Sequence, residues 1–421
     1  MRKLALLSLV LVSSIPAQKN PLDEMIQAAR ASSPALKDLL LKGMPTIKAR
    51  GAVAVWGQDF LFAVDAPLAS IVSISLQGKP PAPMTRVPDS TIWYRLEKMG
   101  GGAVYRFQFF ADGKPLSAND NFSYDGAGYL PDSYPQPGVP RGAQSEMKTH
   151  ISKIYPDMKA NYWVYVNPGI DTVRGAPLMV WQDGETHVDA ADLIRKRMQI
   201  VTDNLVHQKR IPPMVHVLVS PGASKDGRPM RSIQYDTVSS LYGRYLLEEI
   251  LPEVEQRYKI RADAYSRAIE GISSGAICAW NVAWYYPEQF SRVLSNIGSF
   301  APLQWRPEQG LEGGNIIPTR VRLNPRKNIR IWLSDGTDDN SVWSFQNIML
   351  ANSLKMQGYD FHFRFGEGMH SVAQGALDLP EALTWLWRDY DPAVTQKNFE
   401  QDPAERDKPM FRVQIANRDA W

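Results

Sequence analysis

Two hydrophobic patterns divide this chain. In the first part, short segments alternate apolar and polar residues and are separated by Gly, Pro and Asp-Gly turns. In the second part, apolar strand-like runs alternate with helical stretches. Closely spaced strands are typical of a small antiparallel sandwich, whereas strand and helix alternation is typical of a parallel, doubly wound sheet. The sequence therefore predicts two domains of different class.

The same patterns predict the boundaries of the parts. Residues 18–48 are expected to be helical, 49–125 to form a β-sandwich module, and 126–149 to form a linker rich in proline and glycine. An α/β domain is expected over 150–392, followed by a tail over 393–421. The sandwich strands are predicted over 53–56, 61–64, 72–76, 92–96 and 104–110. The strands of the α/β domain are predicted over 162–166, 178–181, 215–219, 268–271, 293–297, 329–333 and 361–365. Helices are predicted over 20–42 and 236–258.

The first residues have the pattern of a secretory signal peptide. Met1, Arg2 and Lys3 supply positive charge, residues 4–12 form a short apolar run, and small residues follow up to Ala17. The apolar run is too short to span a membrane. We therefore expect a signal peptide over residues 1–17, a secreted or periplasmic protein, and no stable membrane insertion.

Composition excludes several classes of protein. The 421 residues are 44% hydrophobic and 22% charged, with a formal net charge of +3, so no nucleic-acid partner is expected. Cys278 is the single cysteine, which rules out an internal disulfide. The chain lacks an H-E-x-x-H motif and paired C-x-x-C motifs, so neither a metal nor an organic cofactor is expected. The sequence makes no prediction of oligomeric state.

The most informative motif is Gly271-Ile272-Ser273-Ser274-Gly275. It lies between a short apolar strand and a helix, as the G-x-S-x-G nucleophile elbow of an α/β-hydrolase does. A tight turn there exposes the hydroxyl of the middle serine. The two glycines are expected because a Cβ at either position would collide with the neighbouring strand and helix. The motif therefore predicts Ser273 as the nucleophile, in preference to Ser274.

The partners of such a serine follow it in the order acid, then histidine. An acidic loop with Asp335, Asp338 and Asp339 follows one predicted strand, and His370 lies on a glycine-rich loop after the next. Any of the three acids could fill the role, and the others could cap the following helix. His370 is therefore the predicted base. The other histidines fit less well. His362 and His216 are expected to be packed within strands, and His150, His187 and His207 lie outside a suitable loop.

This set of residues fits one kind of chemistry. A serine hydroxyl needs a base to take its proton as it attacks a carbonyl, and a carboxylate orients that base. Backbone N–H groups hold the oxyanion that forms. One donor is expected from Ser274 and the other from the loop after the strand at 178–181, at Gly184 or Glu185. Because this loop reads Gln-Asp-Gly-Glu and not His-Gly-Gly, the second donor stays open.

The layout of these motifs resembles the putative-esterase superfamily of α/β-hydrolases. Members include enterochelin esterases, esterase D proteins, and the feruloyl and acetylxylan esterases of carbohydrate esterase family 1. The resemblance is carried by residues 162–169, 181–184, 248–252, 271–275 and 366–371. It covers the α/β part of the chain, and the sandwich resembles the immunoglobulin-like early-set module that precedes the hydrolase in enterochelin esterase.

This resemblance implies a serine esterase without a cofactor, acting on siderophore or polysaccharide-linked feruloyl or acetyl esters. In these families the acid commonly follows the glycine of a D-G-x-x-D loop by three residues, which here is Asp339, with Asp338 as the alternative. Two other functions stay open: a binding protein with a degenerate hydrolase domain, and an acyltransferase of the same fold. The enterochelin esterase that the chain resembles acts in the cytoplasm, whereas this chain has an export pattern.

Aromatic residues of the sandwich raise a question about its role. Trp56, Trp93 and Tyr94 lie near predicted turns, where exposed rings could stack on sugars. The alternative is that the tryptophans fill the core or dock on the hydrolase, and the sequence favours this alternative.

Overall fold

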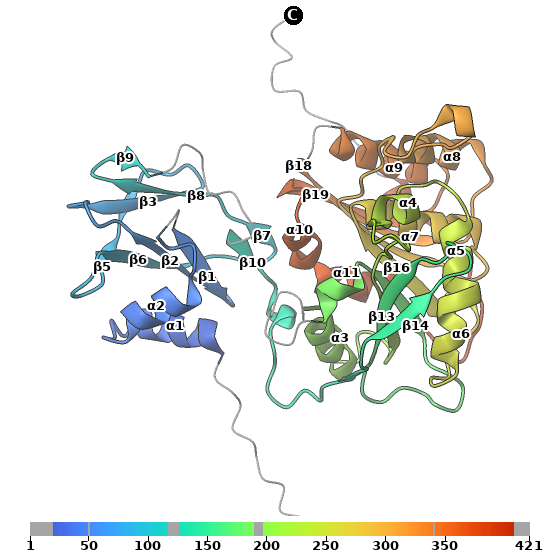
Figure 1. Ribbon diagram of the computed structural model, residues 1–421, viewed down its shortest axis with the longest axis horizontal. Coiled ribbons are helices and arrows are strands. Elements are labelled where there is room, and N and C mark those ends of the chain that lie inside the picture. The colour runs from blue at the N-terminus through green and yellow to red at the C-terminus, as the bar shows by residue number, and fades with distance from the viewer. Residues whose placement is uncertain (1–19, 49–50, 117–125, 189–196, 340–341, 408–421) are drawn as a thin grey trace, which may run out of the picture. The chain divides into compact units, whose positions relative to one another are not determined.

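The computed structural model describes residues 20–48, 51–116, 126–188, 197–339 and 342–407. These residues form two compact units, each with its own core. The first consists of the chain up to residue 99 together with 105–126. The second consists of 100–104 together with the chain from 127 onwards (Figure 1). The predicted signal peptide at 1–17 lies outside the described residues.

Two helices open the first unit. They are α1 (Pro21–Arg30) and α2 (Leu36–Gly43). The single helix predicted over 20–42 is therefore wrong, because the chain turns between them, where Ser32 has a φ of 48°. Asn20 caps α1 by accepting a hydrogen bond from the Leu22 N–H at 2.8 Å. Both helices pack on the adjoining sheet through buried residues such as Ile26 and Leu40.

The strands of the first unit form two antiparallel sheets. One has the order β1-β2-β6-β5, and the other has the order β4-β3-β8-β9. The strands are β1 (Ala52–Trp56), β2 (Asp59–Asp65), β3 (Val72–Leu76), β4 (Ala82–Pro83), β5 (Thr85–Arg86), β6 (Ile92–Lys98), β8 (Phe107–Ala111) and β9 (Lys114–Pro115). Phe60 and Phe62 from one sheet and Phe107 and Phe109 from the other share a buried cluster. The two sheets therefore pack face to face as a sandwich.

The strand predicted over 104–110 is not continuous. Its start belongs to β7 (Ala103–Val104), which pairs with β10 (Ala127–Gly128) in the second unit, and β8 begins only at Phe107. The predicted linker also contains structure. Two short strands, β11 (Ala143–Gln144) and β12 (Lys148–Ile151), lie within it or begin at its end, and both pair with β13 (Lys159–Val166) in the sheet of the second unit. Periodicity missed these two- and four-residue strands because they are too short to show alternation.

The aromatic residues of the sandwich are not exposed. Trp93 is 9% exposed and lies in the cluster between the sheets, and Tyr94 is 7% exposed and packs on the other side, beneath the helices. Trp56 is partly buried against the same helices. The idea that these rings offer a stacking surface for sugars is therefore wrong, and their role in packing accounts for them.

The second unit is built on a nine-stranded sheet. Its order is β11-β13-β15-β14-β16-β17-β18-β19, with β12 also paired to β13. The main strands are β13 (Lys159–Val166), β14 (Leu178–Gln182), β15 (Val215–Val219), β16 (Arg267–Ile272), β17 (Arg292–Asn296), β18 (Arg330–Asp338) and β19 (Asp360–Met369). All pairings from β15 to β19 are parallel, and β13 is antiparallel to β15. Each predicted strand of this domain is present, so the prediction of a doubly wound, mostly parallel sheet is confirmed.

Helices cover both faces of this sheet. They are α3 (Arg197–His207), α4 (Arg231–Tyr235), α5 (Leu241–Tyr245), α6 (Leu251–Glu255), α7 (Ser274–Tyr285), α8 (Ile317–Leu323), α9 (Trp343–Met356), α10 (Val372–Leu377), α11 (Leu379–Leu386) and α12 (Pro403–Arg406). Neighbouring residues of a strand face opposite layers: Ile331 packs in the cluster of α4 to α9, and Trp332 packs with α3 and α11. The helix predicted over 236–258 is shorter, running from 241 to 255 with a π-helical turn at Leu246–Ile250.

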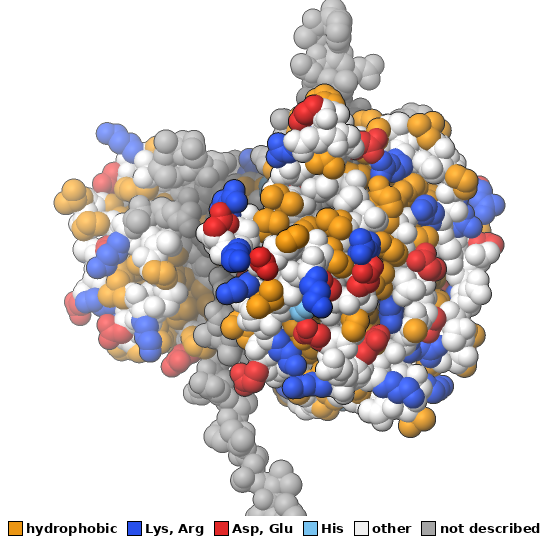
Figure 2. Space-filling model, turned by 45° about the vertical axis from the view of Figure 1, so that its right-hand side comes forward, with side chains coloured by type: hydrophobic (Ala, Val, Ile, Leu, Met, Phe, Trp, Pro, Cys, Tyr) orange, Lys and Arg blue, Asp and Glu red, His pale blue; other side chains and the backbone are white. Residues whose placement is uncertain are grey.

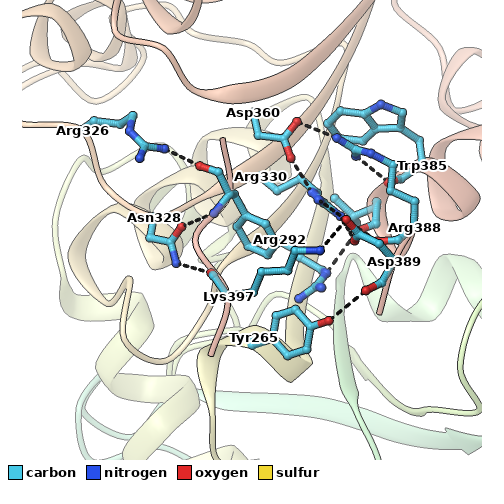
Figure 3. A network of polar contacts seen from close by, with 12 residues as sticks. Tyr265, Arg292, Arg326, Asn328, Arg330, Asp360, Trp385, Arg388, Asp389 and Lys397 are labelled. Atoms are coloured by element: carbon cyan, nitrogen blue, oxygen red, sulfur yellow. Dashed lines mark hydrogen bonds and ion pairs between the residues drawn. The ribbon is translucent and has the colours of Figure 1, made fainter. Parts of the chain in front are cut away.

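A buried network holds the amino-terminal edge of the sheet (Figure 3). Arg292, Arg330 and Asp360 begin three neighbouring strands and are aligned in register. Arg330 Nε lies 2.7 Å from an Asp360 carboxylate oxygen, and its Nη1 lies 3.1 Å from Asp389. The Arg292 guanidinium lies 4.5 Å from the ring centre of Tyr265, and burial lowers its pKa to about 9. These contacts fix the register of the three strands. The register in turn determines how far each strand extends at the carboxyl-terminal edge of the sheet.

On the face that Figure 2 shows, basic and acidic side chains are interspersed with apolar ones, and charge of one sign is not concentrated in a single area. This agrees with the small net charge. Within the described ranges, every helix is too short or too polar to cross a bilayer.

Candidate active site

The turn between β16 and α7 has the geometry of a nucleophile elbow. Ser273 has φ 60° and ψ −120°, a strained conformation for a residue with a side chain. A Cβ on Gly271 would lie 1.9 Å from the carbonyl oxygen of Gly275, so strand and helix approach too closely for any other residue there. A Cβ on Gly275 would lie 3.3 Å from the Cβ of Gln182, which is tight but not a collision. The predicted steric reason thus holds strictly for the first glycine only.

The loop after β17 supports the elbow through its backbone. The Ser273 N–H donates to the Asn296 carbonyl at 3.0 Å, and the Ser299 N–H donates to the Ser273 carbonyl at 3.2 Å. Both backbone groups of the strained residue are therefore satisfied by the neighbouring strand end. This pairing compensates part of the cost of the unusual backbone conformation.

His370 lies directly after β19 and faces the elbow. Its Nε2 is 2.7 Å from Ser273 Oγ, a hydrogen-bond distance. Trp343, the first residue of α9, packs on the imidazole with ring centres 4.3 Å apart. Ser371, which follows His370, caps α10 by accepting a hydrogen bond from the Gln374 N–H, and this cap anchors the loop. The imidazole is thus held between the serine and an aromatic ring.

The three acids of the loop after β18 occupy different surroundings. Asp339 Oδ1 lies 2.8 Å from His370 Nδ1, and the Asp339 side chain is fully buried. Asp338 is exposed at the end of the strand. Asp335 is buried, and its carboxyl accepts hydrogen bonds from the Gly336 N–H at 2.7 Å and from Asn347 Nδ2 at 2.6 Å. The structure therefore brings Ser273, His370 and Asp339 into one line, and leaves Asp338 outside it.

A second serine contacts the first, which the sequence did not predict. Ser299 is fully buried, and its Oγ lies 2.7 Å from Ser273 Oγ. When Ser273 donates its proton towards His370, the Ser299 hydroxyl must be the donor in this second hydrogen bond. A Ser-x-Ile-Gly-Ser sequence after a strand carries no recognised signal, so only the three-dimensional packing could identify this contact.

The turn after β14 contains the candidates for the second oxyanion donor. Asp183 has a left-handed backbone with φ 52° and forms two hydrogen bonds of 2.7 Å with Arg231. The Glu185 N–H donates to Ser220 Oγ at 3.1 Å. A Cβ on Gly184 would lie 2.4 Å from the Leu218 backbone. The Asp183–Arg231 pair therefore ties this turn to α4, and the absence of a side chain at Gly184 lets the turn lie close to β15. Ser274, the other expected donor, begins α7, so its N–H is at a helix N-terminus.

The other histidines lie away from this line. His216 is fully buried, accepts from Trp181 Nε1 at 3.1 Å and contacts Asn167 at 2.8 Å, and burial lowers its pKa to about 3. His362 stacks on Trp332 with ring centres 4.2 Å apart. Both are packing residues, as the strand pattern predicted. Burial also lowers the pKa of His187, to about 4.

Comparison with known protein families identifies the second unit. A family model described as putative esterase matches residues 156–386, which is more than half of the chain. The chain belongs to the putative-esterase family. The predicted family is therefore confirmed, and the matched region of the chain contains the elbow, the acidic loop and the His370 loop.

Individual relatives are distant. The chain is 22% identical over 228 residues to the iron(III) enterobactin esterase of Escherichia coli (strain K12), a match covering 54% of this chain and 53% of that protein. It is 22% identical over 209 residues to an endo-1,4-beta-xylanase/feruloyl esterase of Xylanibacter ruminicola, covering 50% of this chain and 24% of that protein. The chain thus spans about half the length of the enterobactin esterases it matches, and less of the xylanase.

A solved structure supports the fold over more of the chain. The enterobactin esterase of Shigella flexneri, determined in the presence of enterobactin, aligns with a TM-score of 0.54 at 17% identity. The alignment covers 82% of this chain and 98% of that one. This coverage exceeds what the second unit could supply alone, so the likeness extends into the first unit.

The elbow makes a prediction about stability. Gly271→Ala should destabilise the protein by roughly 3 kcal/mol or more, because backbone atoms of α7 would have to move to admit the methyl group. Gly275→Ala is the matched control. It should change stability by no more than about 1 kcal/mol, since the contact is milder and alanine favours helix. Thermal unfolding of both variants tests this, and equal melting temperatures would contradict the described contact.

Proposed function

We propose that this protein is a serine carboxylic-ester hydrolase in which Ser273, His370 and Asp339 form the catalytic triad. The observation that carries the proposal is the pair of contacts on His370, with its Nε2 2.7 Å from Ser273 Oγ and its Nδ1 2.8 Å from Asp339. Each ring nitrogen thus has the partner that the mechanism needs. Membership of the putative-esterase family supports the same activity.

In the proposed reaction, Ser273 Oγ attacks the ester carbonyl carbon while His370 Nε2 takes the hydroxyl proton. The carbonyl electron pair moves onto oxygen, and the resulting oxyanion is held by backbone N–H groups. Collapse of this intermediate expels the alcohol, which receives the proton from His370 and leaves an acyl-enzyme on Ser273. Water then attacks the acyl group with His370 again acting as the base, and this releases the acid.

Asp339 stabilises the imidazolium during both steps. Because its side chain is fully buried, its interaction with the ring is screened little by solvent. The Ser274 N–H supplies one oxyanion donor. The turn at Gly184 and Glu185 supplies the second, and if it is the Glu185 N–H, that group must turn away from Ser220 Oγ, to which it donates in the resting structure.

We also propose esters with an aromatic acyl part as substrates, either a siderophore or a feruloyl group on a polysaccharide. The names of the relatives, enterobactin esterase and feruloyl esterase, support this class. In support, Trp343 packs on the imidazole of His370, so an aromatic side chain lies beside the proposed catalytic base. The protein is proposed to be exported, on the basis of its first 17 residues, and its first unit is proposed to be an early-set module.

Removal of the nucleophile should abolish turnover without affecting the fold. Ser273→Ala should lower kcat on a short p-nitrophenyl ester by roughly 10⁴-fold or more, because no group remains to form the acyl-enzyme. Ser274→Ala is the matched control, since it removes the adjacent hydroxyl and keeps the backbone N–H. Steady-state kinetics with circular dichroism of both variants tests this. Turnover by Ser273→Ala at the wild-type rate would refute the proposal.

The acid can be tested by a paired substitution. Asp339→Asn should lower kcat by roughly 10⁴-fold, because the neutral amide no longer holds the imidazole in the tautomer that accepts a proton. Asp338→Asn should leave kcat within about threefold, because that side chain is exposed to solvent. If Asp338→Asn lost activity severely while Asp339→Asn stayed active, Asp338 and not Asp339 would be the catalytic acid.

The substrate class can be tested with the full chain. We expect kcat/KM to be about tenfold higher for a catecholate trilactone or feruloylated xylan than for acetylated xylan, a difference of the size that one aromatic contact supplies. p-Nitrophenyl ferulate and p-nitrophenyl acetate share a leaving group, so the ratio of their kcat/KM values, measured alongside, isolates the acyl part. A preference for the acetyl ester would exclude an aromatic acyl site.

A further inference from the structure

The nucleophile has a second hydroxyl partner that the proposed mechanism does not use. Ser299 Oγ lies 2.7 Å from Ser273 Oγ, which in turn lies 2.7 Å from His370 Nε2. Ser299 is fully buried, so bulk water does not reach its hydroxyl. Within the described ranges, that hydroxyl has no other hydrogen-bond partner. The contact therefore belongs to Ser273 alone.

The positions of the protons follow from the other contacts of His370. Asp339 Oδ1 lies 2.8 Å from His370 Nδ1, so this nitrogen carries the ring proton and Nε2 is an acceptor. Ser273 then donates its single proton to Nε2, and its oxygen accepts from Ser299. The Ser299 hydroxyl is thus a donor aimed at the oxygen that attacks the substrate.

The loop that carries Ser299 is held in an unusual backbone conformation. Ile297, two residues earlier, has a φ of 42°, which β-branched residues rarely adopt. Its N–H donates to the Ser334 carbonyl of β18 at 2.7 Å, and Asn347 Nδ2 of α9 donates to the Gly298 carbonyl at 2.7 Å. Such strain persists only where neighbouring elements impose it, and it is concentrated at functional sites. Contacts from β18 and α9 therefore hold Ser299 in its place beside the elbow.

We propose that Ser299 is a further catalytic residue, which donates a hydrogen bond to Ser273 Oγ and stabilises the negative charge that this atom develops during the reaction. This role rests on the proposed function of Ser273. Ser299 keeps its own proton throughout, so it acts neither as a base nor as a nucleophile. Its contribution is that of a fixed donor, like the N–H groups that hold the oxyanion.

The donor acts in both halves of the reaction. During acylation, Oγ becomes partly anionic as its proton passes to His370 and its bond to the carbonyl carbon forms. During deacylation that bond breaks, the electron pair returns to Oγ, and His370 returns the proton. A hydrogen bond to a charged acceptor is stronger than one between neutral groups. Ser299 therefore binds Oγ more tightly in these transition states than in the resting enzyme, which raises kcat.

Two alanine substitutions test this role. Ser299→Ala should lower kcat on p-nitrophenyl acetate by roughly 10–100-fold and change KM by less than about threefold, a smaller loss than removal of a donor to a full oxyanion causes. The rate of labelling by a fluorophosphonate should fall by a similar factor, because labelling uses the same attack. Ser295→Ala is the matched control and should keep wild-type kcat. The Ser295 hydroxyl is also fully buried, four residues earlier, and has no hydrogen-bond partner among the described residues.

A double-mutant cycle tests the hydrogen bond without any activity. Ser273→Ala leaves the buried Ser299 hydroxyl without its acceptor, whereas the double variant, Ser273→Ala with Ser299→Ala, removes both groups. The melting temperature of the double variant should therefore be higher than the sum of the two single shifts predicts. Additive shifts would mean that the two hydroxyls do not interact.

The outcomes separate this proposal from the proposed function. If wild-type protein neither hydrolyses esters nor reacts with the fluorophosphonate, the proposed function fails. If wild type is active and Ser299→Ala equals it in kcat and in labelling rate, the role of Ser299 is refuted and the proposed function stands. An equal loss of kcat in Ser295→Ala would assign the effect to packing of this segment and would also overturn the role of Ser299.

Discussion

The close contact between Gly271 and the backbone of Gly275 is the constraint on which the site depends. It allows α7 to start immediately after β16, so that the single residue at the apex, Ser273, takes a backbone conformation that side chains normally avoid. Such strain persists only where the surroundings determine it completely. Here the supports are two backbone hydrogen bonds at the end of the adjacent strand. The Asn296 carbonyl accepts from the Ser273 N–H, and the Ser299 N–H donates to the Ser273 carbonyl. The exposed hydroxyl is thus a consequence of backbone packing.

The two edges of the sheet have different tasks. At the amino-terminal edge, Arg292, Arg330 and Asp360 form a buried network that aligns three strands. At the carboxyl edge, the residues that follow β16, β18 and β19 meet at the proposed triad, although almost a hundred residues separate Ser273 from His370. Since parallel strands in register deliver their following loops to the same edge, a network at one edge supports the geometry at the other.

Much of this arrangement could be predicted from the sequence, and the reasons are local. The elbow motif, the acid loop and the His370 loop each follow a strongly apolar strand, and their chain order matches the α/β-hydrolase order, so the mostly parallel sheet and the family were predicted correctly. Failures occurred where the signal is short or depends on packing. β7, β10 and β11 have two residues each. The break between α1 and α2 was missed although Pro34 lies within it.

The chemistry of single residues was harder to predict than their proximity. Three acids within five residues look alike in sequence, yet one is exposed, one faces the imidazole and one is buried behind it. Ser299 reaches the nucleophile from a different strand and belongs to no motif. Residues of this kind act through burial and through partners distant in the chain, and neither is encoded in local spacing. The burial of Trp93 agrees with the alternative that the sequence favoured, in which it fills the core.

The central claim is that Ser273 is an activated nucleophile, and covalent labelling tests it most directly. Purified full-length protein would be treated with a fluorophosphonate, digested, and analysed by mass spectrometry, with a His370→Ala variant treated in parallel. A serine activated by His370 should acquire one phosphonyl group per chain, located on Ser273, and the variant should react far more slowly. Absence of an adduct on wild-type protein, or its placement on another serine, would contradict the account.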